Sequence, residues 1–152
     1  ISYQSELEHF KKRKEGYLEA LSENGFEGNS QWVREIKFNQ IEQDTEKAVN
    51  ELIIDEGVDA ILFGTNSIAL EGLKKIFKMG KVVPEEVEVI TFDESIAFEF
   101  FKNHIPYIKQ PIHEMGKEAM RILVEQIDQK LNKINRIYLE AELQRASAPV
   151  VR

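Results

Sequence analysis

Short apolar runs alternate along the chain with longer segments in which apolar residues recur every three to four positions. The short runs predict strands, and the longer segments predict amphipathic helices with one buried face. The predicted strands cover residues 1–3, 32–38, 59–64, 87–92, 105–108 and 136–144. The predicted helices cover residues 6–24, 39–57, 67–79, 96–101 and 111–130. Strands and helices therefore alternate along almost the whole chain.

Two of these strands indicate how the sheet is built. Residues 59–64 (DAILFG) and 87–92 (VEVITF) are mostly apolar, as expected for strands that are buried on both faces. Helices connect the successive strands, which favours crossover connections between parallel neighbours. The pattern therefore predicts an α/β fold with a doubly wound, mainly parallel sheet.

Local signals set some of the helix boundaries. Asn39 and Glu42 have the spacing of a capping box, in which two side chains satisfy the first amide groups of a helix. Pro111 is suited to the first turn of a helix because its missing N–H is not needed there. Gly25 and Gly80 follow two predicted helices and favour their termination.

Polar and aromatic residues follow several of the predicted strands. Phe38, the segment 64–66 (GTN) and Asp93 all lie at carboxyl ends of strands. In open parallel sheets, ligands bind in the crevice outside these ends. The sequence therefore predicts a ligand site at this edge of the sheet.

Composition and charge exclude several functions for this chain by itself. The net charge is -7 and the isoelectric point is about 5.1, whereas a DNA-binding surface needs a basic stripe. The chain has no cysteine, so disulfides and thiolate chemistry are excluded. His9, His104 and His113 lack the spacing of a helical metal site, and we interpret them as surface or packing residues. We expect neither a metal nor a cofactor.

The chain carries no apolar run long enough to span a membrane and no recognisable signal peptide. It opens at residues 1–3 (ISY) without a methionine, so we expect the start to lie within a larger protein.

Five segments, in this order, resemble the lactose/galactose-repressor (LacI/GalR) family of bacterial transcription regulators. The segment 13–17 (RKEGY) is similar to the R-x-x-G-[FY] helix of the family, and 59–73 is similar to its "DAI…TN…A.G.L" strand and helix. The segments 83–94 (VPEEVEVITFDE) and 108–116 (IKQPIHEMG) resemble its "VPEDVSVIGFDD" stretch and its "(I/V)xQP…MG" crossover. The closing segment 143–147 (LQRAS) resembles "LxxRxS". The segments 83–94 and 108–116 together are specific to the family, whereas each of the other segments alone is a weak signal.

The resemblance implies a type I periplasmic-binding-protein-like fold, in which two α/β subdomains enclose a ligand cleft. Residues 1–109 and 143–152 would belong to the C-terminal subdomain, and residues 111–139 would be a remnant of the N-terminal one. The DNA-binding domain would be absent from this chain. One face of the helix after Pro111 would then lack its usual partner and would pack in a neighbouring chain or cover another apolar surface. That face consists of Met115, Ala119, Ile122, Leu123 and Ile127.

By the same resemblance, five residues would contact a small effector. Arg13 matches the arginine that grips the effector, and Asp93 matches the aspartate after the fourth strand. Asn66 matches a strand-end asparagine, Phe38 an aromatic wall, and Gln110 a crossover residue that touches ligand and hinge. Other interpretations stay open: a solvated charge for Arg13, a helix cap for Asp93 and core packing for Phe38.

Two positions depart from the family pattern. Some relatives carry further polar contacts just before the arginine, where this chain has Leu7 and His9. Ligand contacts there cannot be transferred, so the resemblance leaves the effector class open beyond a sugar or a sugar derivative.

Three functions compete. The resemblance favours a cytoplasmic effector-sensing module, which acts as a homodimer and reaches operator DNA only through a helix-turn-helix domain absent here. A periplasmic sugar-binding protein of a transporter would share the fold. An enzyme would need a nucleophile–base pair, a phosphate loop or a metal cluster. The segment 64–66 is too poor in glycine for a dinucleotide loop, and the adjacent acids Asp93 and Glu94 are a weak catalytic signal.

Overall fold

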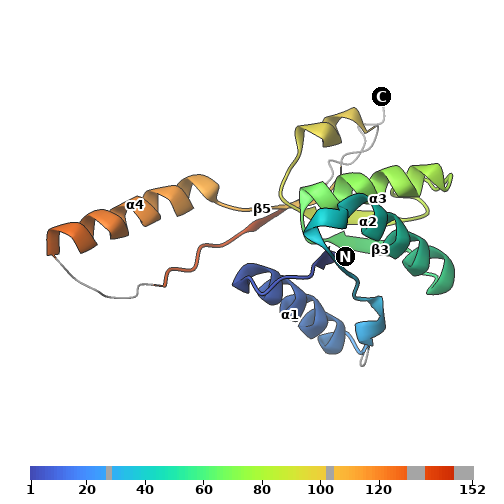
Figure 1. The fold of residues 1–152 in the computed structure, drawn as a ribbon, viewed down its shortest axis with the longest axis horizontal. Helices are drawn as coiled ribbons and strands as arrows, with labels where there is room; N and C mark the ends of the chain where they lie inside the picture. Colours follow the sequence, from blue (N-terminus) through green and yellow to red (C-terminus); the bar gives the residue numbers. More distant parts are fainter. Residues whose placement is uncertain (27–28, 102–104, 130–135, 146–152) are drawn as a thin grey trace.

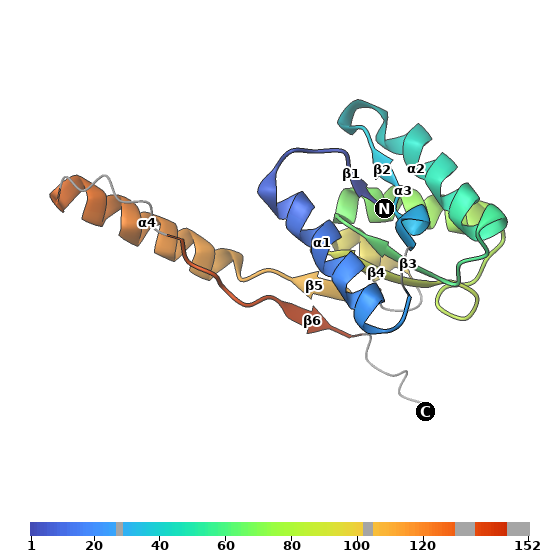
Figure 2. The ribbon, with the colours of Figure 1, turned by 90° about the horizontal axis from the view of Figure 1, so that it is seen from below.

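A single layer of short strands forms the centre of the molecule in the computed structural model (Figures 1 and 2). The structure describes residues 1–26, 29–101, 105–129 and 136–145. Within these residues the strands are β1 (Ser2–Tyr3), β2 (Glu35–Ile36), β3 (Ala60–Phe63), β4 (Glu88–Phe92), β5 (Tyr107–Lys109) and β6 (Glu142–Gln144).

The strands follow the spatial order β2-β1-β3-β4-β5-β6. β1 pairs in parallel with β2, and β3, β4 and β5 are parallel neighbours. Two backbone hydrogen bonds of Ile1 join these groups: its amino group donates to the Leu62 carbonyl at 2.7 Å, and its carbonyl accepts from the Gly64 N–H at 2.8 Å. β6 is antiparallel to β5. The sheet is mainly parallel, which confirms the predicted fold class.

Helices cover both faces of this sheet. The long helices are α1 (Glu8–Glu23), α2 (Ile41–Asn50), α3 (Asn66–Lys78) and α4 (Ile112–Gln129). The short turns are η1 (Asn29–Trp32), η2 (Phe38–Gln40), η3 (Glu51–Asp55), which continues α2 as a π-helical turn, and η4 (Ile96–Phe100). Figure 2 shows α1 in front of the sheet, with α2 and α3 behind it. The sheet is therefore doubly wound.

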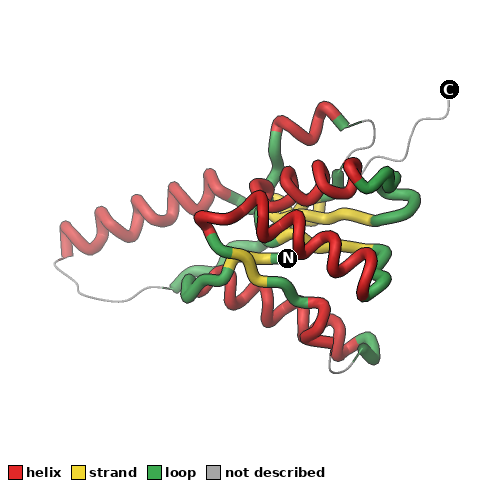
Figure 3. The backbone as a smooth tube through the Cα atoms, turned by 45° about the vertical axis from the view of Figure 1, so that its right-hand side comes forward, coloured by secondary structure: helices red, strands yellow, loops and turns green. Residues whose placement is uncertain are grey.

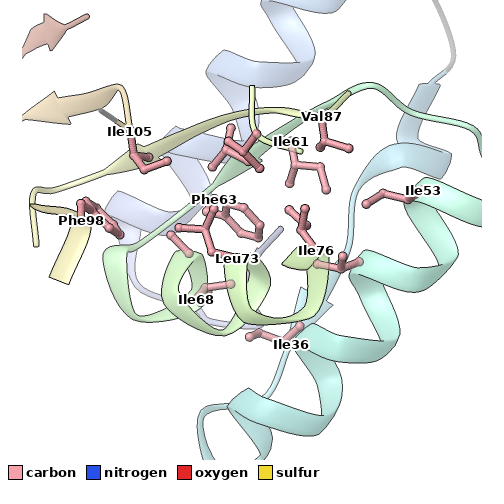
Figure 4. Packing of buried hydrophobic residues seen from close by; sticks show 14 of the residues in the cluster. Ile36, Ile53, Ile61, Phe63, Ile68, Leu73, Ile76, Val87, Phe98 and Ile105 are labelled. Atoms are coloured by element: carbon pink, nitrogen blue, oxygen red, sulfur yellow. The ribbon is translucent and has the colours of Figure 1, made fainter. Parts of the chain in front are cut away.

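The core lies between the sheet and the α2–α3 layer. Alternate residues of the central strands are buried, among them Ile61 and Phe63, which point to this side (Figure 4). Val89 of β4 is buried as well. These side chains meet Leu73 and Ile76 of α3, which are fully buried. Burying each such side chain contributes about 1.5–3 kcal/mol of stability.

The opposite side of the sheet is less completely covered. A cavity of about 730 Å³ lies between α1 and the sheet. Tyr17 and Leu21 of α1 line it on one side, and Leu62, Ile90 and Phe92 line it on the other. This face of the central strands is therefore apolar, but α1 alone does not fill the space above it.

The strand predicted over residues 32–38 is wrong at both ends. Only Glu35 and Ile36 pair, because the partner strand β1 offers two residues. The Lys37 N–H donates to the Asp44 carboxylate at 3.0 Å, which turns the chain into η2. The predicted capping box is also wrong, because Gln40 is the N-cap of α2 and makes no side-chain capping hydrogen bond.

The last predicted strand, over residues 136–144, is shorter than expected. Only Glu142–Gln144 forms, since β5 offers just three residues to pair with. Beyond β5 the chain enters α4 at Pro111, which has no N–H to continue the ladder. Residues 136–141 are exposed and have no regular structure.

α4 stands apart from the rest of the molecule (Figures 1 and 3). Met115 is 46% exposed, Leu123 47% and Ile127 67%, so the described chain leaves much of the apolar face uncovered. Ala119 is also exposed, and Ile122 is half-buried. The predicted alternative, that the face covers another apolar surface, is wrong for these exposed residues, and packing in a neighbouring chain stays a prediction. None of the described helices is long and apolar enough to cross a membrane.

Candidate functional site

The five residues predicted to bind a ligand all lie at the carboxyl edge of the sheet. Phe38 follows β2, Asn66 follows β3, Asp93 follows β4 and Gln110 follows β5. Arg13 comes from α1 and reaches the same edge, because its guanidinium donates to the Gly64 carbonyl just after β3 at 2.6 Å. The topology therefore collects residues that are up to 97 positions apart, from Arg13 to Gln110.

Arg13 is held between an apolar ring and a carbonyl oxygen. Its guanidinium carbon lies 4.2 Å from the centre of the Phe92 ring and 5.7 Å from that of Phe10. Burial lowers the pKa of Arg13, and the negative charge of Asp93 opposes this effect. Arg13 is half-buried. It is not a freely solvated charge, so that interpretation of the sequence is wrong.

Asp93 has an unusual backbone conformation. Its φ is 67°, which is the left-handed region that few residues other than glycine, asparagine and aspartate adopt easily. Its N–H donates to the Ile108 carbonyl at 3.0 Å, and its carboxylate accepts a hydrogen bond from the Gln110 side chain. Asp93 therefore connects β4 to the start of α4, rather than capping a helix, and η4 is capped by Ser95.

Asn66 lies at the start of α3 and is tied to the loop after β4. Its side-chain amide donates to the backbone carbonyl of Glu94 at 2.8 Å. The Glu94 carboxylate in turn accepts a hydrogen bond from the Tyr107 hydroxyl at 2.9 Å, which raises the pKa of Tyr107. These bonds hold the loop that carries Asp93 from two sides.

Phe38 begins η2 and is exposed rather than packed in the core. Its ring lies face to face with that of Tyr3, with centres 3.9 Å apart and planes 10° apart. It also meets Phe10 at a steep angle of 67°. The side chain is nevertheless 54% exposed, so the core-packing interpretation of Phe38 is wrong.

The contacts join the five residues into one continuous arrangement. Phe10 touches both Phe38 and Arg13, and Arg13 lies within electrostatic reach of Asp93. Gln110 binds Asp93 directly, and Asn66 binds the residue after it. The edge therefore has an aromatic end at Phe38, a cation in its middle and a polar end at Asp93.

Sequence reasoning missed three residues of this arrangement. The Tyr3 ring stacks on Phe38, and the Phe92 ring lies under the Arg13 guanidinium. Glu94 accepts hydrogen bonds from the side chains of Asn66 and Tyr107. Tyr3 and Phe92 end their strands, so the strand-end rule that selected Phe38 could also have selected them. No sequence signal indicated the partners of Glu94.

The 730 Å³ cavity is distinct from this arrangement. Arg13 and Gly64 line it, whereas Phe38, Asn66, Asp93 and Gln110 do not. It extends along the sheet face toward the amino ends of β3 and β4, at Ala60 and Glu88. The predicted ligand residues instead follow the edge where the strands end.

The two described histidines lie beside an aromatic ring and a carboxylate, respectively. His9 contacts Phe10 with ring centres 4.1 Å apart, and His113 is exposed beside Glu114. His104 lies outside the described residues. No group of three or more potential metal ligands occurs in the part of the chain that the structure describes. Leu7, the other position that departs from the family pattern, is 54% exposed just before α1.

Known proteins with similar sequences are transcription regulators. Residues 1–147 match the family described as "Periplasmic binding protein-like domain". The HTH-type transcriptional repressor PurR of Aliivibrio salmonicida is 33% identical over 121 residues, which is 79% of this chain and 36% of that protein. The chain therefore spans little more than a third of this relative.

Solved structures of regulators have the same fold. The transcriptional regulator CelR–cellobiose complex is 28% identical with a TM-score of 0.84, over 96% of this chain and 44% of that one. The transcription regulator CcpA of Lactococcus lactis has a TM-score of 0.80 at 22% identity, over 96% of this chain and 53% of that one. The latter supports the fold alone.

These relatives are regulators, so the enzyme interpretation is set aside. Both the family match and the structural matches cover nearly the whole chain. The chain therefore belongs to the periplasmic binding protein-like domain family, in the form found in transcription regulators of the LacI type.

Proposed function

We propose that the chain is the ligand-sensing part of a bacterial DNA-binding transcription regulator, and that its effector is a sugar or a sugar derivative. The observation that carries the proposal is the convergence of Arg13, Phe38, Asn66, Asp93 and Gln110 on one edge of the sheet. The chain spans only 36% of the PurR relative, so DNA binding is assigned to residues outside it.

The chemistry of this edge suits a polyhydroxylated ring. Carboxylate and amide groups at Asp93 and Asn66 can exchange hydrogen bonds with hydroxyl groups. Arg13 offers several N–H donors in a rigid fork, of which one is used on the Gly64 carbonyl. Phe38 offers an exposed aromatic face for the apolar side of the ring. A related regulator, CelR, has been solved in complex with cellobiose, which supports the same class of ligand.

The proposal also assigns the two parts of the chain to different subdomains. Residues 1–109 and 143–152 would form the C-terminal subdomain, and residues 111–139 would belong to the second wall of the cleft. The separation of α4 from the sheet supports this assignment (Figure 1). Gln110, which binds Asp93, lies at the junction between them. A ligand that engages Asp93 would therefore act directly at the connection between the subdomains.

Regulation would follow from a shift between two arrangements of the subdomains. A ligand that binds the closed cleft more tightly favours that state, by no more than its differential affinity for the two. In a cytoplasmic homodimer the closure would change the spacing of the two DNA-binding domains and so the affinity for operator DNA.

A thermal-shift screen tests the ligand class. It uses the regulator that contains this chain, since the proposal assigns the other wall of the cleft to residues outside it. The compounds are neutral sugars, including glucose, ribose and cellobiose, together with their phosphorylated forms. A true effector at 100 times its Kd should add about 2.7 kcal/mol of stability. Unchanged melting with every sugar would contradict the proposal.

A further inference from the structure

Tyr3 links the two ends of the candidate site. It is the last residue of β1, and its side chain is only 6% exposed. One face of its ring lies against Phe38, with centres 3.9 Å apart and planes 10° apart. A buried, well-packed ring therefore supports an exposed one from behind.

The Tyr3 hydroxyl lies near the polar part of the edge. Thr65 lies close enough to this hydroxyl to offset part of the rise in the pKa of Tyr3 that burial causes. Thr65 accepts a hydrogen bond from the Ile68 N–H at 3.3 Å and so caps α3. The next residue, Asn66, binds the loop after β4. Tyr3 therefore stacks on the aromatic wall and lies beside the start of the polar wall.

Core packing alone does not account for this arrangement. A phenylalanine would fill the same space without burying a hydroxyl group, which costs free energy unless that group is hydrogen-bonded. Among the aromatic rings of the described residues, Phe10 also contacts Phe38, but at a steep angle of 67°, so without Tyr3 the exposed Phe38 ring would lose the flat surface behind it. Stacked aromatic pairs contribute about 0.5–1.5 kcal/mol beyond their burial.

We propose that Tyr3 is a positioning residue of the ligand site, which holds the Phe38 ring flat toward the ligand. A fixed aromatic plate favours a cyclic sugar, whose C–H groups form a flat apolar face, over the open-chain alditol with the same carbon skeleton and stereocentres. This inference rests on the proposed function and adds to it the residue that selects a closed ring.

Fluorine NMR tests the positioning without any ligand. The chain is labelled with 4-fluorophenylalanine, and Phe38→Leu identifies the Phe38 signal. Tyr3→Phe keeps an aromatic ring behind Phe38 and should leave its ring-current shift in place. Tyr3→Leu should remove that shift. Phe98→Leu is the matched control, because Phe98 is 4% exposed and lies away from the site in η4. It should lower stability and leave the Phe38 signal unchanged.

Selectivity is measured with the same regulator as in the thermal-shift screen. The probes are glucose and ribose, each paired with its open-chain alditol. The wild-type protein should prefer the cyclic member of at least one pair. Tyr3→Leu should reduce that preference by about threefold to tenfold, the loss of one aromatic stack, whereas Tyr3→Phe and Phe98→Leu should stay within about twofold.

The outcomes separate this inference from the function on which it rests. An unchanged fluorine signal of Phe38 in Tyr3→Leu overturns the positioning role, regardless of which probes bind. A changed signal with unchanged preference for the cyclic probe overturns the selectivity. If no probe binds the wild-type regulator, the sugar class and its selection fail together, and the fluorine shift alone decides whether Tyr3 positions Phe38.

Discussion

Asp93 lies at a position where both the backbone and the side chain are constrained. Its φ of 67° is tolerated by asparagine and aspartate better than by other residues with a side chain. Its carboxylate accepts a hydrogen bond from Gln110 and faces the positive charge of Arg13. The conformation and the contacts have separate consequences, which two substitutions can distinguish.

Backbone strain at this position predicts a difference between two substitutions that both remove the charge. Asp93→Asn keeps a side chain suited to positive φ, whereas Asp93→Ala does not, so Asp93→Ala should be less stable than Asp93→Asn by about 1 kcal/mol. Urea denaturation of the two variants measures the difference. Equal midpoints with equal slopes would show that the left-handed conformation costs nothing here.

The proposed role of Asp93 predicts a loss of induction. In the regulator that contains the chain, Asp93→Ala should abolish the response to effector and leave operator affinity intact, because the proposed function assigns DNA binding to residues outside this chain. Operator binding followed by fluorescence anisotropy, with and without effector, measures both. Gln110→Glu, which keeps the length of the side chain, tests the neighbouring contact. Normal induction in Asp93→Ala would remove Asp93 from the site.

Single residues were predictable where they combine chemistry with a strand end. Phe38, Asn66 and Asp93 were selected in this way, and the family motif added Arg13. Glu94 was not predictable as an anchor, because its partners Asn66 and Tyr107 are 28 and 13 positions away along the chain. Such partners are set by the alignment of neighbouring strands.

At the scale of elements, α3 and β3 fit together through one glycine. A Cβ atom on Gly72 would lie 2.2 Å from Cζ of Phe63, so a larger residue has no room there. The ring of Phe63 is fully buried and packs directly on the helix backbone (Figure 4). This contact sets the distance of α3 from the sheet, and α3 begins at the site residue Asn66.

This contact predicts a strong effect of a single methyl group. Gly72→Ala should lower the free energy of unfolding by about 1–3 kcal/mol, because overpacking outweighs the better helix propensity of alanine. Urea denaturation measures this change in the free energy of unfolding. In a Phe63→Leu background, Gly72→Ala should lower the free energy of unfolding by less than it does in the wild-type chain, because leucine leaves more room for the methyl group. Equal losses in the two backgrounds would contradict the contact. Gly16→Ala is the control, since nothing lies within 4 Å of a Cβ there.

Helices were easier to predict than strands. The helical spacing of apolar residues identified α1, α3 and α4 to within a few residues, and the helix predicted over residues 39–57 corresponds to α2 together with η3. This spacing is set by neighbouring residues along one helix, so it needs no partner strand to be recognised. Strand ends depend on the partner instead. β2 stops at Ile36 because β1 offers only two residues, and β6 is limited by the three residues of β5.

At the scale of the whole molecule, α4 carries an apolar stripe that the described chain leaves uncovered. Its most exposed members are Ile112 at 74%, Ile127 at 67% and Met120 at 58%. The helix lies away from the sheet, beside the returning segment that leads to β6 (Figures 1 and 2). An exposed apolar stripe of this kind favours association.

The stripe predicts that the chain associates at high concentration. Leu123→Glu should shift the chain toward the monomer, because it introduces a charge into the apolar stripe. Sedimentation velocity at increasing concentration measures the shift. Lys117→Glu, on the polar side of α4, should leave association unchanged, while circular dichroism checks that helix content is retained. A chain that stays monomeric at all concentrations would contradict the prediction.

The sequence alone determined the alternation of strands and helices, the parallel sheet and the edge at which a ligand would bind. These follow from local periodicity and from the rule that parallel strands end on one side, so neighbouring residues suffice to read them. Only the tertiary structure decided which residues meet at that edge. Tyr3 behind Phe38, Phe92 beneath Arg13 and Gln110 on Asp93 depend on the order and alignment of the strands, which hydrogen bonds between distant segments fix.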